Sequence, residues 1–301
     1  MNKHVTATHV TAMHARDALI EFDAGPHKYT CAGEGNYLSV TSWLHSHFPA
    51  FDADAIIGKM NLTNPKCKYY GQTPEQIKAG WDKGRDEAAA LGTEMHKAIE
   101  EFWLGGCPPG PPDLGQVETE GWTQEADAQS GYTAIETPVL GQVETEGNNL
   151  PAKGGLSSHF ISFLKDNPNL RCYRTEWMIF DEDVRLAGSI DFVAENEDGT
   201  LTIYDWKRCK DIKKTNSFGG SALAECISHL PDTNYWHYAL QLNTYKTILE
   251  RKYGKTVKAM FLVGLHPALP RYQLLKVPEL RTEMAELFAL RVERLLPEGI
   301  H

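Results

Sequence analysis

The segment from Leu186 to Lys207 constrains the fold more than any other part of the 301-residue chain. Two apolar, strand-like runs flank the turn sequence Asn-Glu-Asp-Gly-Thr, which is typical of a β-hairpin. Asp191 lies on the first run, and Asp205 lies near the end of the second, two residues before Lys207. Because side chains alternate between the two faces of a strand, Asp205 and Lys207 should emerge on the same side.

The length of the hairpin loop decides whether the two aspartates can act together. A loop with an odd number of residues around Asp198 places Asp191 opposite Asp205. A tight two-residue loop places Asp191 opposite Trp206 instead, and sends the two carboxylates to opposite faces of the sheet. We therefore predict a loop of three or five residues, or a bulge.

Two carboxylates beside a lysine suit the metal-dependent hydrolysis of a phosphodiester. Carboxylate oxygens bind hard divalent cations, and an ammonium group can stabilise charge on the attacking water or on the scissile phosphate. An ordinary hairpin with charges that face solvent gives the same pattern, so the motif alone leaves both interpretations open.

Further short motifs stand in a fixed order around the hairpin. They are Gly92-Thr93-Glu94-Met95-His96 on a helical stretch, Glu176 before the hairpin, Gly188 three residues before Asp191, and Gln241 with Tyr245 after it. In this order the chain resembles the PD-(D/E)XK nuclease superfamily, in its RecB-like exonuclease branch, over roughly residues 80–104 and 155–265. Within that branch it is similar to viral, phage and mitochondrial-genome-maintenance-type exonucleases.

The resemblance implies a role for each of these residues. The implied ligands of a Mg2+ or Mn2+ ion are His96, Asp191, Asp205 and the backbone carbonyl of Trp206. Lys207 would orient or deprotonate the attacking water, and Glu176 would position that water or a second metal. The residues implied to line the site from a following helix are Gln241 and Tyr245. Neutral imidazole suits Mn2+ better than Mg2+, so both metals stay open.

Each of these residues also has a purely structural interpretation. His96 lies at the edge of an apolar helical stripe and could be a hydrogen-bonded core histidine. Glu176 could be an exposed strand residue, and Gln241 and Tyr245 could be ordinary packing on one helix face. Ser42 is a candidate N-cap of the short helix that follows it, and that helix start could also receive a phosphate.

The net charge of −10 is unfavourable for a protein that binds phosphates, so nucleic-acid contacts should come from a local basic surface. The stretch from Lys207 to Lys214 is such a surface, and we expect Arg208 and Lys210 to contact the substrate backbone. Nearby aromatic residues would stack on the unpaired bases of a single-stranded end. A solvated charged loop is the structural alternative.

Composition narrows the class of protein. The 42% apolar content is enough for one substantial core, and no apolar run is long enough to span a membrane. The six cysteines are scattered without a C-x-x-C pair, which favours a reducing intracellular compartment, whether viral, nuclear or mitochondrial. Some RecB-like nucleases carry a four-cysteine iron–sulfur cluster. Because no cysteine follows Cys226, we expect no cluster here.

Two segments are expected to lie outside the folded core. Residues 1–20 contain a degenerate histidine repeat and are predicted to be a flexible tail. The octapeptide from Leu114 to Gly121 recurs from Leu140 to Gly147, within an acidic Gly/Pro-rich insertion at 105–155 that we expect to be disordered. Residues 21–104 then form the N-terminal region with the histidine-bearing helix, and 156–301 the nuclease core with its C-terminal helix.

The remaining pattern alternates helices and strands. We predict helices at about 75–104, 156–166, 232–252 and 278–296, and strands at about 171–180, 184–194, 200–208, 257–265 and 271–277. A small strand pair and a helix are expected within 20–48. The pattern alone gives an α/β or α+β fold with a mixed sheet. The resemblance specifies a restriction-endonuclease-like core, a mixed central sheet flanked by helices in the order αβββαβ.

The carboxylates and the lysine predict metal-dependent hydrolysis of phosphodiesters, and the resemblance implies a DNA exonuclease that acts on DNA ends in replication, recombination or repair. A structure-specific endonuclease and a non-catalytic nucleic-acid-binding protein with the same fold are the alternatives. The expected partners are DNA, as single strands or ends, and recombination or replication proteins, without a membrane. Cleavage polarity, strand preference, DNA or RNA selectivity and oligomeric state are not readable from the sequence.

Overall fold

The computed structural model describes residues 13–105, 156–216 and 219–296. The predicted order of helices and strands is confirmed, with boundaries that differ by a few residues. The strands are β1 (Ile20–Asp23), β2 (Lys28–Cys31), β3 (Glu34–Ser39), β4 (Cys172–Asp181), β5 (Leu186–Glu195), β6 (Leu201–Lys207), β7 (Val257–Gly264) and β8 (Gln273–Lys276). The α-helices are α1 (Val40–His45), α2 (Ala53–Gly58), α3 (Pro74–Leu104), α4 (Ser158–Asp166), α5 (Asn234–Lys252) and α6 (Arg281–Leu295), and the 3-10 helices are η1 (Ala15–Leu19) and η2 (Glu225–Ile227).

The strands form one mixed eight-stranded sheet in the order β1-β2-β3-β5-β6-β7-β8, with β4 paired to β5. β4, β5 and β6 are antiparallel neighbours, whereas β6 and β7 are parallel and are joined by helix α5. The succession α4, β4, β5, β6, α5, β7 is the αβββαβ order that the sequence predicts. The expected α/β class with a restriction-endonuclease-like core is therefore confirmed.

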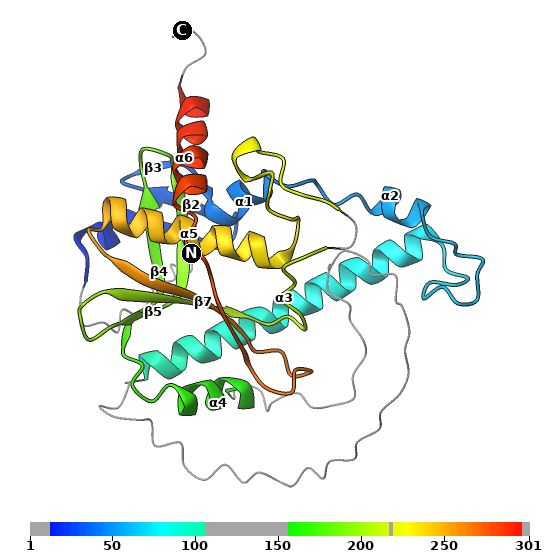
Figure 1. Ribbon diagram of the computed structural model, residues 1–301, viewed down its shortest axis with the longest axis horizontal. Helices are drawn as coiled ribbons and strands as arrows, with labels where there is room; N and C mark the ends of the chain where they lie inside the picture. The colour runs from blue at the N-terminus through cyan, green and yellow to red at the C-terminus, as the bar shows by residue number, and fades with distance from the viewer. Residues whose placement is uncertain (1–12, 106–155, 217–218, 297–301) are drawn as a thin grey trace.

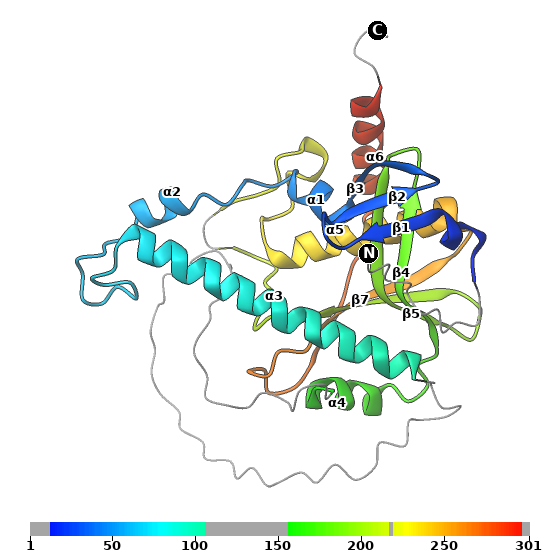
Figure 2. The same ribbon diagram turned by 180° about the vertical axis from the view of Figure 1, so that it is seen from behind.

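Helices cover both faces of the sheet (Figures 1 and 2). On one face, Ile190, Val193 and Ile203 pack in a buried cluster with Leu242 and Tyr245 of α5. On the other face, the aromatic side chains of β5 and β6 (Phe192, Tyr204 and Trp206) pack against those of α3 and α4 (Trp103, Phe160 and Phe163). Burial of these large apolar surfaces on both sides supplies the main driving force for folding.

The hairpin between β5 and β6 has the register that a functional aspartate pair requires. Glu195 pairs with Leu201 across a five-residue loop, 196–200, so the odd-numbered loop is confirmed. Gly199 adopts φ +76° in this loop, a conformation that glycine reaches without steric cost. The last pair of this ladder is Phe192 with Tyr204. If the same register is continued by one residue, Asp191 lies across from Asp205.

Strand β5 changes its partner along one edge. Leu186 and Ala187 pair with β3 in parallel, and Phe192 to Glu195 pair with β6 in antiparallel. Residues 188–191 lie between these two ladders, while β4 pairs along the opposite edge of β5. The sheet therefore opens beside Asp191, between the end of β3 and the end of β6.

The close packing of α5 on β5 depends on a glycine at 188. A Cβ atom built on Gly188 would lie 2.8 Å from Cε1 of Tyr245, closer than side-chain carbons approach one another. Tyr245 is buried, so its ring has little freedom to retreat. The glycine of one motif thus makes room for the tyrosine of another.

The N-terminal part of the chain differs from the expectation in three respects. Three strands, β1 to β3, precede α1 in place of the strand pair expected within 20–48. Within the predicted tail 1–20, helix η1 is docked on β4 by Asp17, which accepts hydrogen bonds from Arg174 at 2.7 Å and from Trp177 at 3.0 Å. The prediction of Ser42 as an N-cap is wrong, because α1 begins earlier and Ser39 caps it by accepting from the Ser42 backbone amide. Residues 1–12 and the repeat-containing part of the insertion, 106–155, lie outside the described residues.

We predict that Gly188→Ala destabilises the protein by about 1–3 kcal/mol, because the new methyl group overpacks the contact with Tyr245. Gly35→Ala is the matched control in a strand, since nothing lies within 4 Å of the position that its methyl group would take. Urea unfolding monitored by circular dichroism measures both. Equal midpoints for the two variants would contradict the packing account.

We predict that Asp17→Ala lowers the free energy of unfolding by roughly 3 kcal/mol, because it removes a carboxylate that pairs with the buried guanidinium of Arg174 and accepts a hydrogen bond from Trp177. Glu34→Ala removes the more exposed end of the ion pair with Arg185 and should leave the unfolding midpoint almost unchanged. Thermal unfolding of the two variants compares them directly. A melting temperature for Asp17→Ala equal to that of the wild type would show that η1 contributes nothing to stability.

Candidate functional site

Three carboxylates occupy neighbouring positions on three adjacent strands. The β4–β5 ladder runs in register on both sides of Glu176, which therefore lies across from Asp191. The hairpin register places Asp205 on the far side of Asp191, on β6. The sheet thus lines up one carboxylate from each strand at the point where it opens.

The side chain of Asp191 takes the place of a backbone group in the β5–β6 ladder. Its Oδ2 accepts a hydrogen bond of 2.8 Å from the backbone N–H of Trp206. This contact accounts for the opening, because a side chain now stands between the strands where the ladder would continue. Burial raises the pKa of Asp191, and the Glu176 carboxylate adds to that effect.

Helix α3 brings His96 to the same carboxylates. Its Nδ1 lies 3.6 Å from Asp191 Oδ2 and 3.7 Å from Glu176 Oε1. Burial by itself would lower the pKa of His96, but the two carboxylates outweigh it and raise that pKa to about 9. The imidazole of the metal-free protein is therefore protonated at neutral pH. A cation that binds this nitrogen has to displace the proton.

The helix is built to present His96 at this place. It starts with a capping box of Thr73 and Gln76, and its last turns bury Ile99 and Trp103 against the sheet. Gly92 lies one turn before His96, and the space next to its Cα is open. Gly92 and His96 share one face of the helix, so no side chain stands beside the histidine on the preceding turn.

Asp205 and Lys207 emerge on the same side of β6, as the alternation of strand side chains predicts. Asp205 Oδ2 lies 2.7 Å from Lys207 Nζ, and both side chains are largely buried. Burial raises the pKa of Asp205 to about 6, with Lys207 acting against this shift and Asp191 adding to it. Burial alone would lower the pKa of Lys207, but Asp205 reverses the effect and holds it above its usual range. The lysine is therefore a fixed ammonium group.

Helix α5 holds the lysine from the other side. Lys207 Nζ donates to Gln241 Oε1 at 3.4 Å and lies 4.3 Å from the centre of the Tyr238 ring. The amide of Gln241 donates in turn to the hydroxyl of Tyr245 at 3.1 Å and to Thr41 on α1 at 3.3 Å. The glutamine and tyrosine thus act on the site through the position of Lys207.

Glu176 has an unusual backbone for a residue inside a strand. Its φ of +45° lies in the left-handed region, which costs a non-glycine residue of the order of 1 kcal/mol or more. Ser189 on β5 donates to its Oε2 at 3.0 Å, so the other oxygen stays turned toward His96. Strain concentrated at a carboxylate beside a histidine is typical of functional sites.

Three other predicted residues lie at the margin of this site. Ser42 is exposed on α1, where its Oγ accepts from Ser39 and makes no contact with the carboxylates. Arg208 and Lys210 are partly exposed in the loop after β6. Trp206 is buried among the aromatic side chains of the α4 face and reaches the site through its backbone.

Sequence reasoning missed several residues that support the site. Thr41 accepts a hydrogen bond from Gln241, and Ser189 donates one to Glu176. Thr175 donates to the backbone carbonyl of Asp191 at 3.0 Å. Small hydroxyl residues beside functional positions carry no distinctive spacing, so no signal in one sequence would find them. Tyr238 is one of the aromatic residues near the basic stretch that were expected to stack on bases, and its ring lies against Lys207.

The donor set fits a hard divalent cation. One ligand atom from each of His96, Glu176 and Asp191 lies within 4.8 Å of the others. Oδ2 of Asp205 is buried and accepts no well-aligned hydrogen bond in the described structure, although Lys207 is close. Buried carboxylates that face each other repel unless a cation joins them. Glu176, to which the resemblance gives a supporting role, lies in this group with His96 and Asp191, whereas Asp205 is paired with Lys207.

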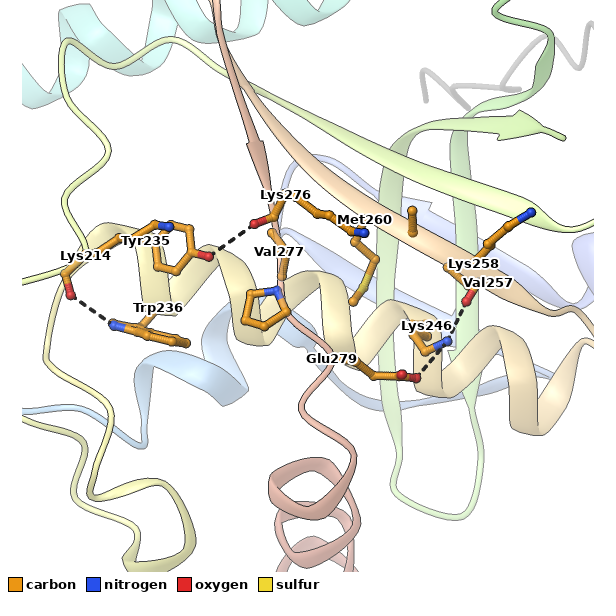
Figure 3. A pocket seen from close by; sticks show the side chains of 12 residues that line it. Lys214, Tyr235, Trp236, Lys246, Val257, Lys258, Met260, Lys276, Val277 and Glu279 are labelled. Atoms are coloured by element: carbon orange, nitrogen blue, oxygen red, sulfur yellow. Dashed lines mark hydrogen bonds and ion pairs between the residues drawn. The ribbon is translucent and has the colours of Figure 1, made fainter.

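A cavity of about 580 Å3 lies elsewhere, between α5, β7 and the segment that follows β8 (Figure 3). Its lining includes Lys214, Trp236, Lys246, Lys276 and Glu279. Lys246 is held there by Glu279 and by Glu250 at 3.1 and 2.7 Å. The three carboxylates Glu176, Asp191 and Asp205, which we call the carboxylate row, do not line this cavity. The candidate metal site is therefore the opening in the sheet and not the cavity.

Comparison with a protein-family model agrees with this geometry. The profile of the PD-(D/E)XK nuclease superfamily matches residues 62–299. A solved structure described as "Crystal structure of SSO0001" is 17% identical with a TM-score of 0.25, over 46% of this chain and 57% of that chain. No curated protein matches. Among the described residues, no helix is long and apolar enough to cross a membrane. The chain is a member of the PD-(D/E)XK nuclease superfamily.

Proposed function

We propose that the protein is a Mg2+- or Mn2+-dependent deoxyribonuclease of the RecB-like branch, and that it acts as an exonuclease on DNA ends in replication, recombination or repair. The observation that carries this proposal is the row of Glu176, Asp191 and Asp205, which meets His96 at one end and Lys207 at the other. Membership of the superfamily supports the proposed nuclease activity and the nucleic-acid substrate.

The carboxylates and the histidine would hold the cation. A bound divalent ion would supply charge neutralisation at the scissile phosphate and lower the pKa of water. Asp191 is fixed by the Trp206 amide and Glu176 by Ser189, so the ligand oxygens are oriented before a metal arrives. Such preorganisation reduces the cost of assembling the site during each cycle.

Lys207 acts as a cation in this scheme. Its raised pKa keeps the ammonium protonated at neutral pH, so it stabilises negative charge on the phosphate rather than removing a proton from water. Gln241 and Tyr238 restrict where the ammonium can move. The resemblance implies that Lys207 either orients or deprotonates the attacking water. Orientation of the water, together with electrostatic stabilisation of the phosphate, fits a permanently charged ammonium group better than deprotonation does.

Assignment to the RecB-like branch rests on the motifs and on their physical connection. Gly188 makes room for Tyr245, Tyr245 accepts from Gln241, and Gln241 accepts from Lys207. The glycine, glutamine, tyrosine and lysine motifs thus form one chain of contacts. We propose that Arg208, Lys210 and Ser42, at the margin of the site, contact the DNA backbone.

A structure-specific endonuclease and a non-catalytic DNA-binding protein are the alternatives. The second would be expected to lack a ligand or the lysine, and every role is filled here. The scattered cysteines, which include no C-x-x-C pair, support our proposal of a reducing intracellular compartment. Recombination or replication proteins are the partners that such an enzyme would meet.

We predict that Lys207→Ala lowers the rate of DNA hydrolysis by about 10²- to 10³-fold, since it removes a charge aimed at the phosphate. The assay uses end-labelled linear DNA, single- and double-stranded, with Mg2+ or Mn2+. Lys258→Ala, which removes an exposed ion pair with Asp198, is the control and should keep its activity. Full activity of the Lys207 variant would contradict the proposal that its ammonium group stabilises charge on the phosphate.

The same assay with covalently closed circular DNA separates the exonuclease from the endonuclease. The proposal predicts that linear molecules are degraded from their ends while closed circles, single- or double-stranded, stay intact under the same conditions. Linearisation of a closed circle would contradict the exonuclease assignment and favour the alternative.

We predict that Asp191→Asn weakens Mn2+ binding by at least about 100-fold and that His96→Gln weakens it by about 10- to 100-fold. Isothermal titration with the metal alone measures this without any nucleic acid. Asp198→Asn, an exposed carboxylate in the hairpin loop, is the charge-matched control. Equal affinities for the three variants would show that the metal binds elsewhere.

A further inference from the structure

Helix α3 extends well beyond the sheet on the side that precedes His96. Its last turns pack on the core, but its first turns lie beside α2 and the α2–α3 loop, residues 59–72, and project from the body of the protein (Figures 1 and 2). Trp81 fixes this projection: its Nε1 donates to Tyr69 Oη at 2.9 Å, and its ring meets Phe51 at 5.7 Å. The loop is therefore held at a defined distance from the catalytic residues.

The charges along this projection are distributed unevenly. Each cation on the shaft of α3 has an acidic partner: Lys78 pairs with Asp54, Lys83 with Glu87, and Arg85 with Asp82 and Asp86. The α2–α3 loop contains Lys59, Lys66 and Lys68 and no acidic residue. All three lysines are exposed, and none lies within ion-pair distance of a carboxylate in the described part of the chain.

The loop also presents an aromatic ring to solvent. Tyr70 is 55% exposed, whereas the neighbouring Tyr69 is anchored on Trp81. Unpaired lysines beside an exposed tyrosine, on a protein of net charge −10, form a local surface suited to the phosphates of a nucleic-acid backbone. Within residues 59–72, Tyr70 is the one large hydrophobic side chain that is largely exposed, so a protein partner has less support.

The length of α3 sets the distance between this loop and the site. At a rise of 1.5 Å per residue, the helix covers roughly 33 Å from Pro74 to His96. B-form DNA rises about 3.4 Å per base pair, so the same distance corresponds to roughly 10 base pairs. DNA that enters the site and runs along α3 would reach the loop at that distance from the cleaved bond.

We propose that the α2–α3 loop is a second DNA-binding surface, which holds the substrate backbone about ten base pairs from the cleaved bond. The proposal rests on the nuclease function above. It makes α3 a spacer with the catalytic histidine near one end and the basic loop at the other. Substrates too short to reach the loop should bind more weakly, although the chemistry at their ends is the same.

The test compares Lys66→Ser/Lys68→Ser with Lys83→Ser/Lys258→Ser, which removes two exposed cations that already have acidic partners. Affinity for duplexes of about 6 to about 24 base pairs is measured by fluorescence anisotropy, with Ca2+ in place of Mg2+ so that binding does not depend on cleavage. We expect wild-type affinity to rise between about 8 and 14 base pairs and then to level off. In the loop variant this rise should disappear, with about 10-fold weaker binding of long duplexes and a salt dependence reduced by about two ions.

Several outcomes would overturn the proposal. Affinity of the loop variant equal to that of the control variant at every length would assign the loop to another partner, such as a protein. Wild-type affinity without a step near ten base pairs would show that the DNA does not follow α3. Hydrolysis of bis-p-nitrophenyl phosphate, which cannot reach the loop, should be the same in both variants. Failure of the wild type to cleave any DNA would contradict the nuclease function instead.

Discussion

The structure of the site depends on one hydrogen bond, in which the carboxylate of Asp191 accepts from the backbone amide of Trp206. A side chain thereby takes the place of a rung in the β5–β6 ladder, and the sheet opens at that point. β3 pairs with β5 on one side of the opening and β6 on the other. The carboxylates line this gap, α3 delivers His96 to it, and α5 positions Lys207 there.

Electrostatics explains why such an arrangement suits a metal. Burial raises the pKa of Asp191 and of Asp205, which means that their charged forms are not fully compensated in the metal-free protein. The carboxylates raise the pKa of His96 to about 9, so the protonated imidazole compensates part of their charge. The ammonium group of Lys207 pairs with Asp205. A divalent cation would satisfy the same carboxylates and release the histidine proton. Glu176, whose backbone is strained, adds a third carboxylate to this group, and its Oε1 lies 3.7 Å from His96 Nδ1.

Much of the fold was predictable because strand and helix periodicities were clear. The odd hairpin loop followed from the requirement that Asp191 and Asp205 meet, and the structure has it. Other features depend on contacts between distant parts of the chain. The docking of η1 through Asp17 joins residues more than 150 positions apart, and the support of Glu176 by Ser189 depends on strand register. The cap at Ser39 was missed because Ser39 and Ser42 are equally good caps on sequence grounds.

The most direct test of the central claim is the position of the metal. Crystals grown with Mn2+ and measured at the manganese absorption edge locate the ion without reference to activity. We expect an anomalous peak in the opening of the sheet, bonded to Asp191 and within reach of His96, Glu176 and Asp205. A peak outside that opening, or no peak there at saturating Mn2+, would contradict the claim that this carboxylate row is the catalytic metal site.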